Sequence, residues 1–367
     1  MTSDGGFIFL VVRRMSRVAT PVAHIMDNPE LRQDIVTGDW VVLAAGRASR
    51  PNFLDGAKEK RKRSSLEDCP FEQPQPEKAS IIYYTDRDRK EWGLQIVPNK
   101  YPVLEHGEVC SVINRYGPYT YATAVGQHDV VITRNHDNNF AMLPPGEANA
   151  LFRAFKERYQ QMAQDSCVNY FFAFHNWGPG AGASIYHPHY QILGLPVVPP
   201  DVERSLEGSR NYFEKHRACV HCEMIAWERQ SKYRVAFENE WAVAFAPYAS
   251  RFPFEMKIFP KKHLPNFEET DDGDMRCVVE LLQKTLSAMT RELNDPDYNF
   301  YIHTAPMRNK NLYEHYHWHI EILPKISVIA SVEIGTGIEI NTVHPGKAAE
   351  MLRERVNARG ERLTPDL

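Results

Sequence analysis

The residues best suited to chemistry lie in one short stretch, residues 184–192. In an extended strand alternate side chains share a face, so His187, His189 and Gln191 would project together. A glycine-rich segment, residues 176–183, comes immediately before, and its backbone could approach an anion closely. Two imidazoles and a carboxamide beside such a loop predict a nucleophile that acts on a phosphoryl group. The alternative for a lone pair of alternate histidines is a solvated strand face.

The same order of cysteine, single histidine and His-x-His strand occurs twice along the chain, which is typical of an internal duplication. A long amphipathic pattern, predicted as a helix, precedes the His-x-His strand in both halves. Thiolates and imidazoles in a set of four are the ligands that Zn²⁺ prefers. The second half therefore predicts a zinc site made of Cys219, Cys222, His263 and His317.

The first half offers a less regular set of ligands. Glu72 stands where the repeat would place a second thiol after Cys69. Because a carboxylate can also bind zinc, the first half has either kept its metal site or lost it. The candidate ligands of this first site are Cys69, Glu72, His128 and His187.

The bulk composition limits the class of protein. The 367 residues carry a net charge of −4, with 43% hydrophobic and 25% charged residues. This ordinary balance gives no basis for nucleic-acid or membrane binding. The six cysteines do not resemble a disulfide framework, so we expect a reducing, cytoplasmic location. The apolar residues 6–12 are too few to cross a bilayer, and arginines follow them, so no secretory signal is expected.

Strands with one long helix in each half must position these residues. The pattern at residues 31–45 predicts a hairpin that turns at Gly38 and Asp39. Further strands are predicted near residues 94–98, 126–133, 170–176, 241–247, 254–260, 299–304 and 315–321. Helices are predicted near residues 144–164, 201–217, 275–293 and 345–359. The expected fold class is α+β, with two related units of antiparallel sheet and packed helices.

Taken in order, these motifs resemble the galactose-1-phosphate uridylyltransferase family, the nucleotidyltransferase branch of the histidine-triad superfamily. The resemblance runs from about residue 30 to about residue 350. Its most specific part is His187-Pro-His189-x-Gln191 after an asparagine–glycine–serine loop. The weaker parts are residues 47–51, 69–71, 97–102, 126–128, 315–321 and 335–341.

The resemblance implies that His189 attacks the α-phosphorus of a nucleoside-diphosphate sugar and forms a covalent nucleotidyl-histidine. A sugar 1-phosphate, or phosphate itself, would then discharge it in a ping-pong reaction. Gln191 replaces the histidine of hydrolytic relatives, and a carboxamide exchanges no proton at neutral pH, so transfer is expected. The residues matched to substrate contacts are Arg47, Arg50, Asn99, Asn176, Gly182, Ser184, Gln191 and Glu339.

The resemblance also implies one or two structural Zn²⁺ ions per chain and a homodimer, because a partner subunit often supplies the arginine pair. It implies two histidine-triad-like units after an extension of residues 1–30: a catalytic unit, residues 31–198, and a zinc-binding unit, residues 199–367. Ser205 stands at the position that resembles the glutamate of the family's iron-type site, and the Cys219 and Cys222 pair instead resembles the branch that uses a second zinc. The C-terminal segment that reads the hexose keeps Glu339 but is otherwise hard to align, which leaves the hexose open. Some relatives of the zinc branch transfer adenylyl groups from ADP-glucose, which leaves the base open.

Three functions remain open at this point. The first is a uridylyltransferase of the UDP-glucose and galactose 1-phosphate type. The second is a phosphorylase or adenylyltransferase that uses an ADP-glucose-like donor. The third is a zinc-stabilised nucleotide-binding protein without turnover. The serine, histidine and glutamine pattern occurs only in the first half, so core or structural roles are expected for His315 and His319. The alternative is that either lines a vestigial second active site.

Overall fold

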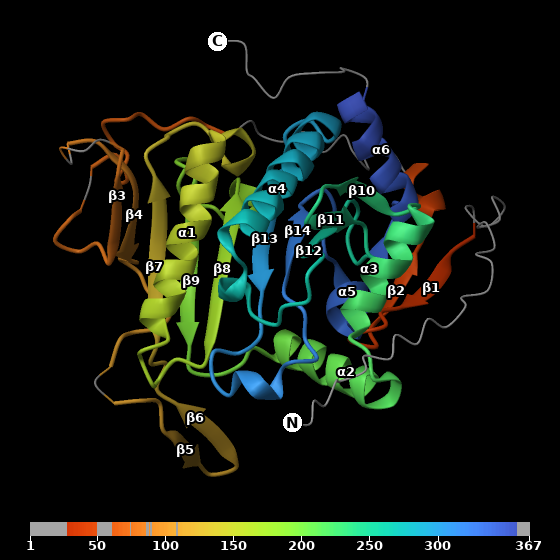
Figure 1. The fold of residues 1–367 in the computed structure, drawn as a ribbon, viewed down its shortest axis with the longest axis horizontal. Coiled ribbons are helices and arrows are strands. Elements are labelled where there is room, and N and C mark those ends of the chain that lie inside the picture. The colour runs from red at the N-terminus through yellow and green to blue at the C-terminus, as the bar shows by residue number, and fades with distance from the viewer. Residues whose placement is uncertain are drawn as a thin grey trace, which may run out of the picture.

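The computed structural model describes residues 28–49, 61–73, 75–85, 88, 90–107 and 109–357. Its centre is a ten-stranded sheet to which each half contributes five strands (Figure 1). The first half contributes β3 (Ile81–Tyr84), β4 (Trp92–Pro98), β7 (Gln127–Thr133), β8 (Tyr170–Trp177) and β9 (His189–Leu195). The second half contributes β10 (Val235–Glu238), β11 (Ala242–Phe245), β12 (Met256–Pro260), β13 (Tyr298–His303) and β14 (His319–Pro324).

The strand order, β10-β11-β12-β14-β13-β8-β9-β7-β4-β3, contains the same arrangement twice. Its pairings are antiparallel, and β8 of the first half pairs with β13 of the second at the middle. Val130 pairs with Gln191 in the first half as Lys257 pairs with Glu321 in the second. The predicted α+β duplication is therefore confirmed, and the two units share one continuous sheet.

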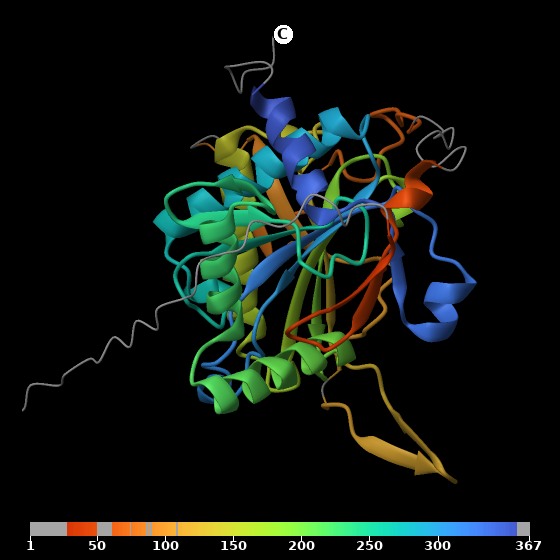
Figure 2. The ribbon, with the colours of Figure 1, turned by 90° about the vertical axis from the view of Figure 1, so that its right-hand side faces the viewer.

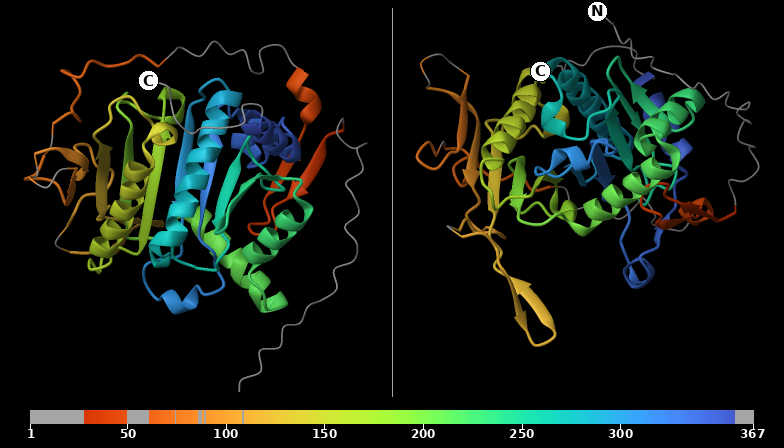
Figure 3. Two further views of the ribbon diagram at one scale, coloured as in Figure 1. Left: turned by 45° about the horizontal axis from the view of Figure 1, so that its top comes forward. Right: turned by 60° about the horizontal axis from the view of Figure 1, so that its bottom comes forward.

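Three helices cover one face of this sheet: α1 (Pro145–Met162), α4 (Asp272–Glu292) and α6 (Pro345–Asn357) (Figure 3). The main hydrophobic core lies between them and the strands and includes Phe155 of α1 and Leu282 of α4. Tyr190 and Ile192 of β9 belong to this core. Because side chains alternate along a strand, His189 and Gln191 point to the opposite face.

The opposite face is covered differently in the two halves. In the second half it carries α2 (Pro200–His216), α3 (Val220–Ser231) and a small sheet of β1 (Glu30–Gln33), β2 (Trp40–Leu43) and β15 (Glu339–Asn341), with α5 (Ser331–Thr336) beside β15. In the first half, the loop residue Phe71 and the strand residues Ile82 and Tyr84 pack there on Val130 and Ile132. Val202 and Leu206 of α2 also reach Tyr170 and Phe172 of β8, whereas around Val130 and Ile132 the face is covered by loop and strand residues.

Most predicted elements are confirmed, with one change at the two His-x-His stretches. β9 begins at His189 and β14 at His319, so His187 and His317 lie in the segments that lead into the strands. Pro188 has no N–H to donate to a ladder, and Trp318 donates its N–H to Leu264 outside the sheet. The first histidine of each pair is thereby free to face a different set of residues from the second.

A hairpin of β5 (Ile113–Tyr116) and β6 (Tyr119–Ala122) projects from the body (Figure 2). A disulfide, Cys110–Cys167, joins its base to the loop after α1. The sequence analysis expected no disulfide framework, and it did not anticipate this bond. Of the helices in the described part of the chain, none combines the length and the apolar character needed to cross a membrane.

Candidate active site and metal centres

His189, the first residue of β9, is arranged as a nucleophile. Its Nδ1 lies 2.9 Å from the carbonyl oxygen of His187, and because a carbonyl only accepts, Nδ1 carries the ring proton. Nε2 therefore keeps its lone pair. Burial lowers the pKa of His189, so its imidazole is neutral near pH 7. A neutral imidazole with a free Nε2 can attack phosphorus without a separate base.

Two neighbouring rings hold the nucleophile in place. The ring centroid of Phe71 lies 5.2 Å from that of His189 and 5.8 Å from that of His187. His175, in β8, donates from Nδ1 to the carbonyl oxygen of His189 at 2.8 Å. Burial lowers the pKa of His175 to about 3, so this donor stays neutral. The ring and the backbone of His189 are thus fixed before a substrate binds. Neither ring was predicted as a site residue, although Phe71 belongs to the motif of residues 69–71 and His175 to the predicted strand 170–176.

Gln191 lies two residues beyond His189 on the same face of β9. Its Oε1 lies 2.8 Å from Nε2 of His128. The same nitrogen of His128 lies 3.1 Å from Nδ2 of Asn99, the residue matched to a nucleoside contact. The structure therefore brings the predicted residues Asn99 and Gln191 together around His128.

Asn176, near the end of β8, faces its cross-strand neighbour Asn299. Nδ2 of Asn299 donates to Oδ1 of Asn176 at 2.7 Å and to the carbonyl oxygen of Ala181 at 2.9 Å. Asn176 lies two residues beyond Phe174, which pairs with Gln191, so Asn176 and Gln191 share a face. Two of the predicted phosphate contacts therefore flank the nucleophile.

The glycine-rich loop uses its own N–H groups inside the protein. Gly180 donates its N–H to Oδ2 of Asp297 at 2.6 Å, and residues 181–183 donate theirs to the carbonyl oxygens of residues 178 and 179. A Cβ on Gly178 would lie 2.0 Å from Asp297, so this approach needs a glycine. Gly182 and Ser184 are exposed at the end of the loop. The side chains of Asn176, Ser184 and Gln191 are then the polar groups of the predicted set that the structure leaves for a phosphate.

A first group of metal-ligand atoms surrounds His187. Its Nδ1 lies 3.2 Å from Oε1 of Glu72 and 3.5 Å from Sγ of Cys69, and its Nε2 donates to the carbonyl oxygen of Thr133 at 2.7 Å. His136 completes the group, with Nδ1 2.7 Å from Oε1 of Glu72. The four ligand atoms lie within 4.8 Å of one another. One thiolate, one carboxylate and two imidazoles fit Zn²⁺, so Glu72 can serve where a second thiol was expected.

His136 thus replaces His128, and the prediction of His128 as a ligand is corrected. Both ring nitrogens of His128 have other neighbours, because Nε2 faces Gln191 and Nδ1 accepts the N–H of Val103 at 3.1 Å. The repeat did contain a signal for His136. It lies three residues beyond the end of β7, as His263 lies three residues beyond the end of β12. The prediction of His128 rested on the order of the histidines along the chain, whereas the place after the strand identifies His136.

Alanine substitutions separate the two histidines experimentally. We expect His136→Ala to lower the metal content by about one ion per chain, because it removes one ligand of four. His128→Ala, the matched control, should keep the wild-type metal content. Elemental analysis of both purified, folded variants checks this result. Unchanged metal in His136→Ala, or loss of metal in His128→Ala, contradicts the assignment.

The second half contains the four predicted ligands in a similar arrangement. Sγ of Cys222 lies 3.3 Å from Nδ1 of His263 and 3.5 Å from Nδ1 of His317. The Nε2 atoms of these histidines face backbone carbonyls at 2.8 and 3.0 Å, which leaves the Nδ1 lone pairs for the centre of the group. Hydrogen bonds to the sulfur of Cys219, above all from Cys222, hold its pKa well below the usual range. Cys219, Cys222, His263 and His317 have ligand atoms within 4.8 Å of one another, as a tetrahedral zinc site requires.

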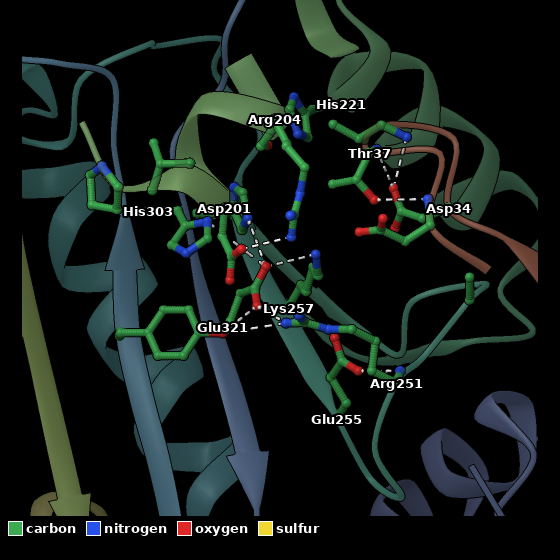
Figure 4. A pocket seen from close by; sticks show the side chains of 18 of the residues that line it. Asp34, Thr37, Asp201, Arg204, His221, Arg251, Glu255, Lys257, His303 and Glu321 are labelled. Carbon is green, nitrogen blue, oxygen red and sulfur yellow. Dashed lines mark hydrogen bonds and ion pairs between the residues drawn. The ribbon is translucent and has the colours of Figure 1, made fainter. Parts of the chain in front are cut away.

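A cavity of about 420 Å³ in the second half lies where the catalytic site lies in the first (Figure 4). Glu321 stands there in place of the carboxamide, and its carboxylate contacts Nζ of Lys257 at 2.7 Å and an Nη of Arg251 at 3.2 Å. A phosphate group would lie against this carboxylate and compete for its cations. His319, the counterpart of the nucleophile, therefore lines a cavity unsuited to phosphate.

The same cavity contains three side chains that could hold a cation, His303, His319 and Glu321. The ammonium group of Lys257 already lies on Oε1 of Glu321, the oxygen nearest to both histidines. Ser205 offers only a hydroxyl, which lies 3.4 Å from that of Tyr316. Because the ammonium group occupies the oxygen nearest to both histidines, these three side chains do not fit a cation site in this cavity.

Two predicted contacts, Arg47 and Glu339, lie away from His189. Arg47 is exposed on η1 (Ala45–Ser49), and Glu339 begins β15, which pairs with β2. This small sheet packs on Ala249, in the loop before β12. β12 lies four positions from β9 in the large sheet, about 19 Å at about 4.8 Å per strand. Arg50 and residues 1–27 lie outside the described residues.

Comparison with known proteins gives a consistent answer. Residues 83–364 match the family described as Domain of unknown function (DUF4921). The chain is 35% identical to an ADP-glucose phosphorylase of Arabidopsis thaliana over 89% of its own length and 93% of the relative. It is 28% identical to a galactose-1-phosphate uridylyltransferase of Thermotoga maritima over 89% and 98% of the two chains.

Solved structures agree with these relatives. The crystal structure of an ADP-glucose phosphorylase from Arabidopsis thaliana with bound ADP-glucose superimposes with a TM-score of 0.74 and 33% identity, over 89% of this chain and 99% of that one. A uridylyltransferase structure superimposes with a TM-score of 0.70 and 28% identity, over 90% and 100% of the two chains. The predicted resemblance is confirmed, and the chain belongs to the galactose-1-phosphate uridylyltransferase family of nucleotidyltransferases and phosphorylases.

Proposed function

We propose that the protein is a sugar-nucleotide phosphorylase that works through a covalent nucleotidyl-His189, with an ADP-glucose-like donor and phosphate as acceptor. The observation that supports the covalent step is the tautomer of His189. Its Nδ1–H donates to the carbonyl oxygen of His187, which leaves the lone pair of Nε2 for nucleophilic attack. The greater identity with an ADP-glucose phosphorylase, 35% against 28%, favours an adenosine donor and a phosphate acceptor.

The reaction has two balanced steps. Nε2 of His189 attacks the α-phosphorus, the bond from that phosphorus to the bridging oxygen breaks, and sugar 1-phosphate leaves with the electron pair. The imidazolium formed is stabilised by the Nδ1–H bond to the carbonyl of His187. An oxygen of phosphate then attacks the same phosphorus, the bond to Nε2 breaks, and a nucleoside diphosphate leaves neutral His189 behind. The carboxamide of Gln191 cannot act as a general acid or base near neutral pH, which suits transfer better than hydrolysis.

The second candidate is transfer to a sugar 1-phosphate, of the UDP-glucose and galactose 1-phosphate type. The match to the Thermotoga maritima uridylyltransferase over nearly its whole length favours it. The chemistry at His189 would be the same, and only the acceptor and the base would differ. A zinc-stabilised protein that binds nucleotides without turnover is disfavoured by the free Nε2 of His189.

We propose that zinc occupies both four-ligand groups. Cys69, Glu72, His136 and His187 would hold one ion, and Cys219, Cys222, His263 and His317 the other. When bound, zinc would supply rigidity, because the first group fixes the loop that presses Phe71 on the nucleophile. This chain's contribution at that point is the ring contact, which holds His189 in its attacking position.

We also propose that the protein is a homodimer and is located in the cytoplasm. Each chain would consist of a catalytic unit, residues 31–198, and a second unit, residues 199–367. Support for the dimer comes from Arg47 and Glu339. Both match substrate contacts, yet their small sheet packs on the second half, several strands from His189. A second copy of the chain could bring these two residues to the site.

The test is to mix the protein separately with ADP-glucose and with UDP-glucose and to measure its intact mass. We expect an AMP adduct on His189, which phosphate discharges with release of ADP. A UMP adduct that only a sugar 1-phosphate discharges would favour the second candidate. No adduct from either donor would refute covalent transfer.

A further inference from the structure

We propose that Asn299 and His128 are positioning residues that determine which end of two carboxamides, Asn176 and Gln191, faces the phosphate. The inference rests on the nucleotidyl transfer proposed above. A carboxamide has an NH₂ group that donates and an oxygen that accepts, and the two ends have nearly the same shape. Phosphate oxygens only accept. The site therefore works only if both amides present their NH₂ groups, and this orientation needs a cause.

Asn299 supplies that cause for Asn176. Its Nδ2 donates to the carbonyl oxygen of Ala181 at 2.9 Å, and because a backbone carbonyl cannot donate, the amide of Asn299 cannot be turned round. The second proton of Nδ2 goes to Oδ1 of Asn176 at 2.7 Å. Nδ2 of Asn176 is then the end left over, and it lies 3.6 Å from the point where a Cβ of Gly182 would be. The donor of Asn176 thus faces the end of the glycine-rich loop.

His128 fixes the orientation of the Gln191 carboxamide in a similar way. The backbone N–H of Val103 donates to Nδ1 of His128 at 3.1 Å, so the neutral ring carries its proton on Nε2. Nε2 then donates to Oε1 of Gln191 at 2.8 Å, and the NH₂ group of Gln191 points away from His128. Nδ2 of Asn99, 3.1 Å from the same Nε2, is also a donor, so this contact is not a hydrogen bond. Oδ1 of Asn99 accepts the backbone N–H of Tyr101 at 2.9 Å, so its NH₂ group stays toward His128. Nε2 of His128 thus has one donor and one acceptor beside it, and the Val103 N–H on Nδ1 selects the acceptor, Oε1 of Gln191, at the shorter distance.

In both cases a backbone group that can only donate or only accept fixes the amide orientation or the tautomer of one side chain, Asn299 or His128. That side chain then fixes which end of the neighbouring carboxamide faces the phosphate. The two side chains differ in origin, since His128 is in β7 of the catalytic half and Asn299 is in β13 of the other half. The second half, whose own cavity is unsuited to phosphate, thus contributes a residue to catalysis through the β8–β13 pairing. Donors held in advance stabilise the charge that grows on phosphate oxygens in the transition state.

The test for Asn299 is Asn299→Asp, which keeps the shape and removes the donor. An aspartate only accepts, so it would draw Nδ2 of Asn176 toward itself and turn Oδ1 toward the phosphate. We expect the single-turnover rate of His189 nucleotidylation by ADP-glucose, or by UDP-glucose if that is the donor, to fall about 10- to 100-fold. Asn299→Ala, which removes the anchor without inverting it, should lose less. A rate for Asn299→Asp within twofold of wild type would overturn the proposal.

A double-mutant cycle separates the effect of the Asn176 amide orientation from a general effect on the loop or on local charge. In an Asn176→Ala background, Asn299→Asp should change the rate less than twofold, because no amide remains to be inverted. Full additivity would overturn the proposal. The parallel cycle uses His128→Ala with Gln191→Ala. We expect about a tenfold loss for His128→Ala alone, because Gln191 is freed instead of inverted, and no further loss in the Gln191→Ala background.

A readout of binding keeps this test separate from the proposed reaction. If the wild-type protein forms no adduct, the proposal of covalent transfer is refuted. The double-mutant cycles are then measured by the Kd of ADP, determined by calorimetry. If Asn299 sets the orientation of the Asn176 amide, Asn299→Asp should still weaken ADP binding at least about tenfold. In an Asn176→Ala background this difference should disappear. Equal Kd values for wild type and Asn299→Asp would overturn the positioning role as well.

Discussion

His189→Ala should show no nucleotide adduct by intact mass and a kcat at least about 10⁴-fold below wild type. The variant lacks the imidazole whose Nδ1 proton is held by the carbonyl oxygen of His187 and whose Nε2 is left as the nucleophile. Without it the reaction would need direct displacement between two anions, which the site is not built to favour. Far-ultraviolet circular dichroism and Tm establish that the variant is folded.

His319→Ala is the matched control for this result. His319 begins β14 as His189 begins β9, and its Nδ1 also faces the carbonyl oxygen two residues earlier, at 3.2 Å. Its neighbour Glu321, paired with Lys257, makes a poor phosphate site. We expect His319→Ala to form the adduct in full if it remains folded. Loss of the adduct in a folded His319→Ala, or its survival in His189→Ala, would show that the nucleophile is misassigned.

Cys222→Ser should have the largest effect on stability. The substitution removes a thiolate on which two imidazoles converge, and metal binding at such sites contributes several kcal/mol to folding. We expect the loss of about one zinc per chain and a Tm about 10 °C lower, since about 1 kcal/mol shifts Tm by 2–4 °C in domains of 150–250 residues. Elemental analysis and thermal unfolding measured by differential scanning calorimetry check both numbers.

Cys277→Ser is the control for Cys222→Ser. Cys277 is a half-buried free thiol on α4 and belongs to neither ligand group of the described chain. Its replacement should change neither the metal content nor the Tm by more than a degree or two. If Cys222→Ser behaves like Cys277→Ser, the second group does not hold a structural metal.

The features that the sequence predicted well are those carried by local patterns. The alternation His187, His189, Gln191 and the two long amphipathic helices follow from strand and helix periods. The duplication followed from the order of cysteines, histidines and His-x-His strands, and it led to a ligand group, Cys219 with Cys222, His263 and His317, that the structure does bring together. The family resemblance, now confirmed, rested on the same motifs.

The features that the sequence did not determine depend on contacts between segments far apart. The choice of His136 over His128 is made by where β7 ends, and the orientation of Gln191 by the N–H of Val103. The pairing of β8 with β13 places Asn299 beside Asn176, and no sequence period links these two residues. A residue type limits the chemistry that a side chain can perform. The hydrogen-bond partners that select its tautomer or its amide orientation come together only when the two halves form one sheet.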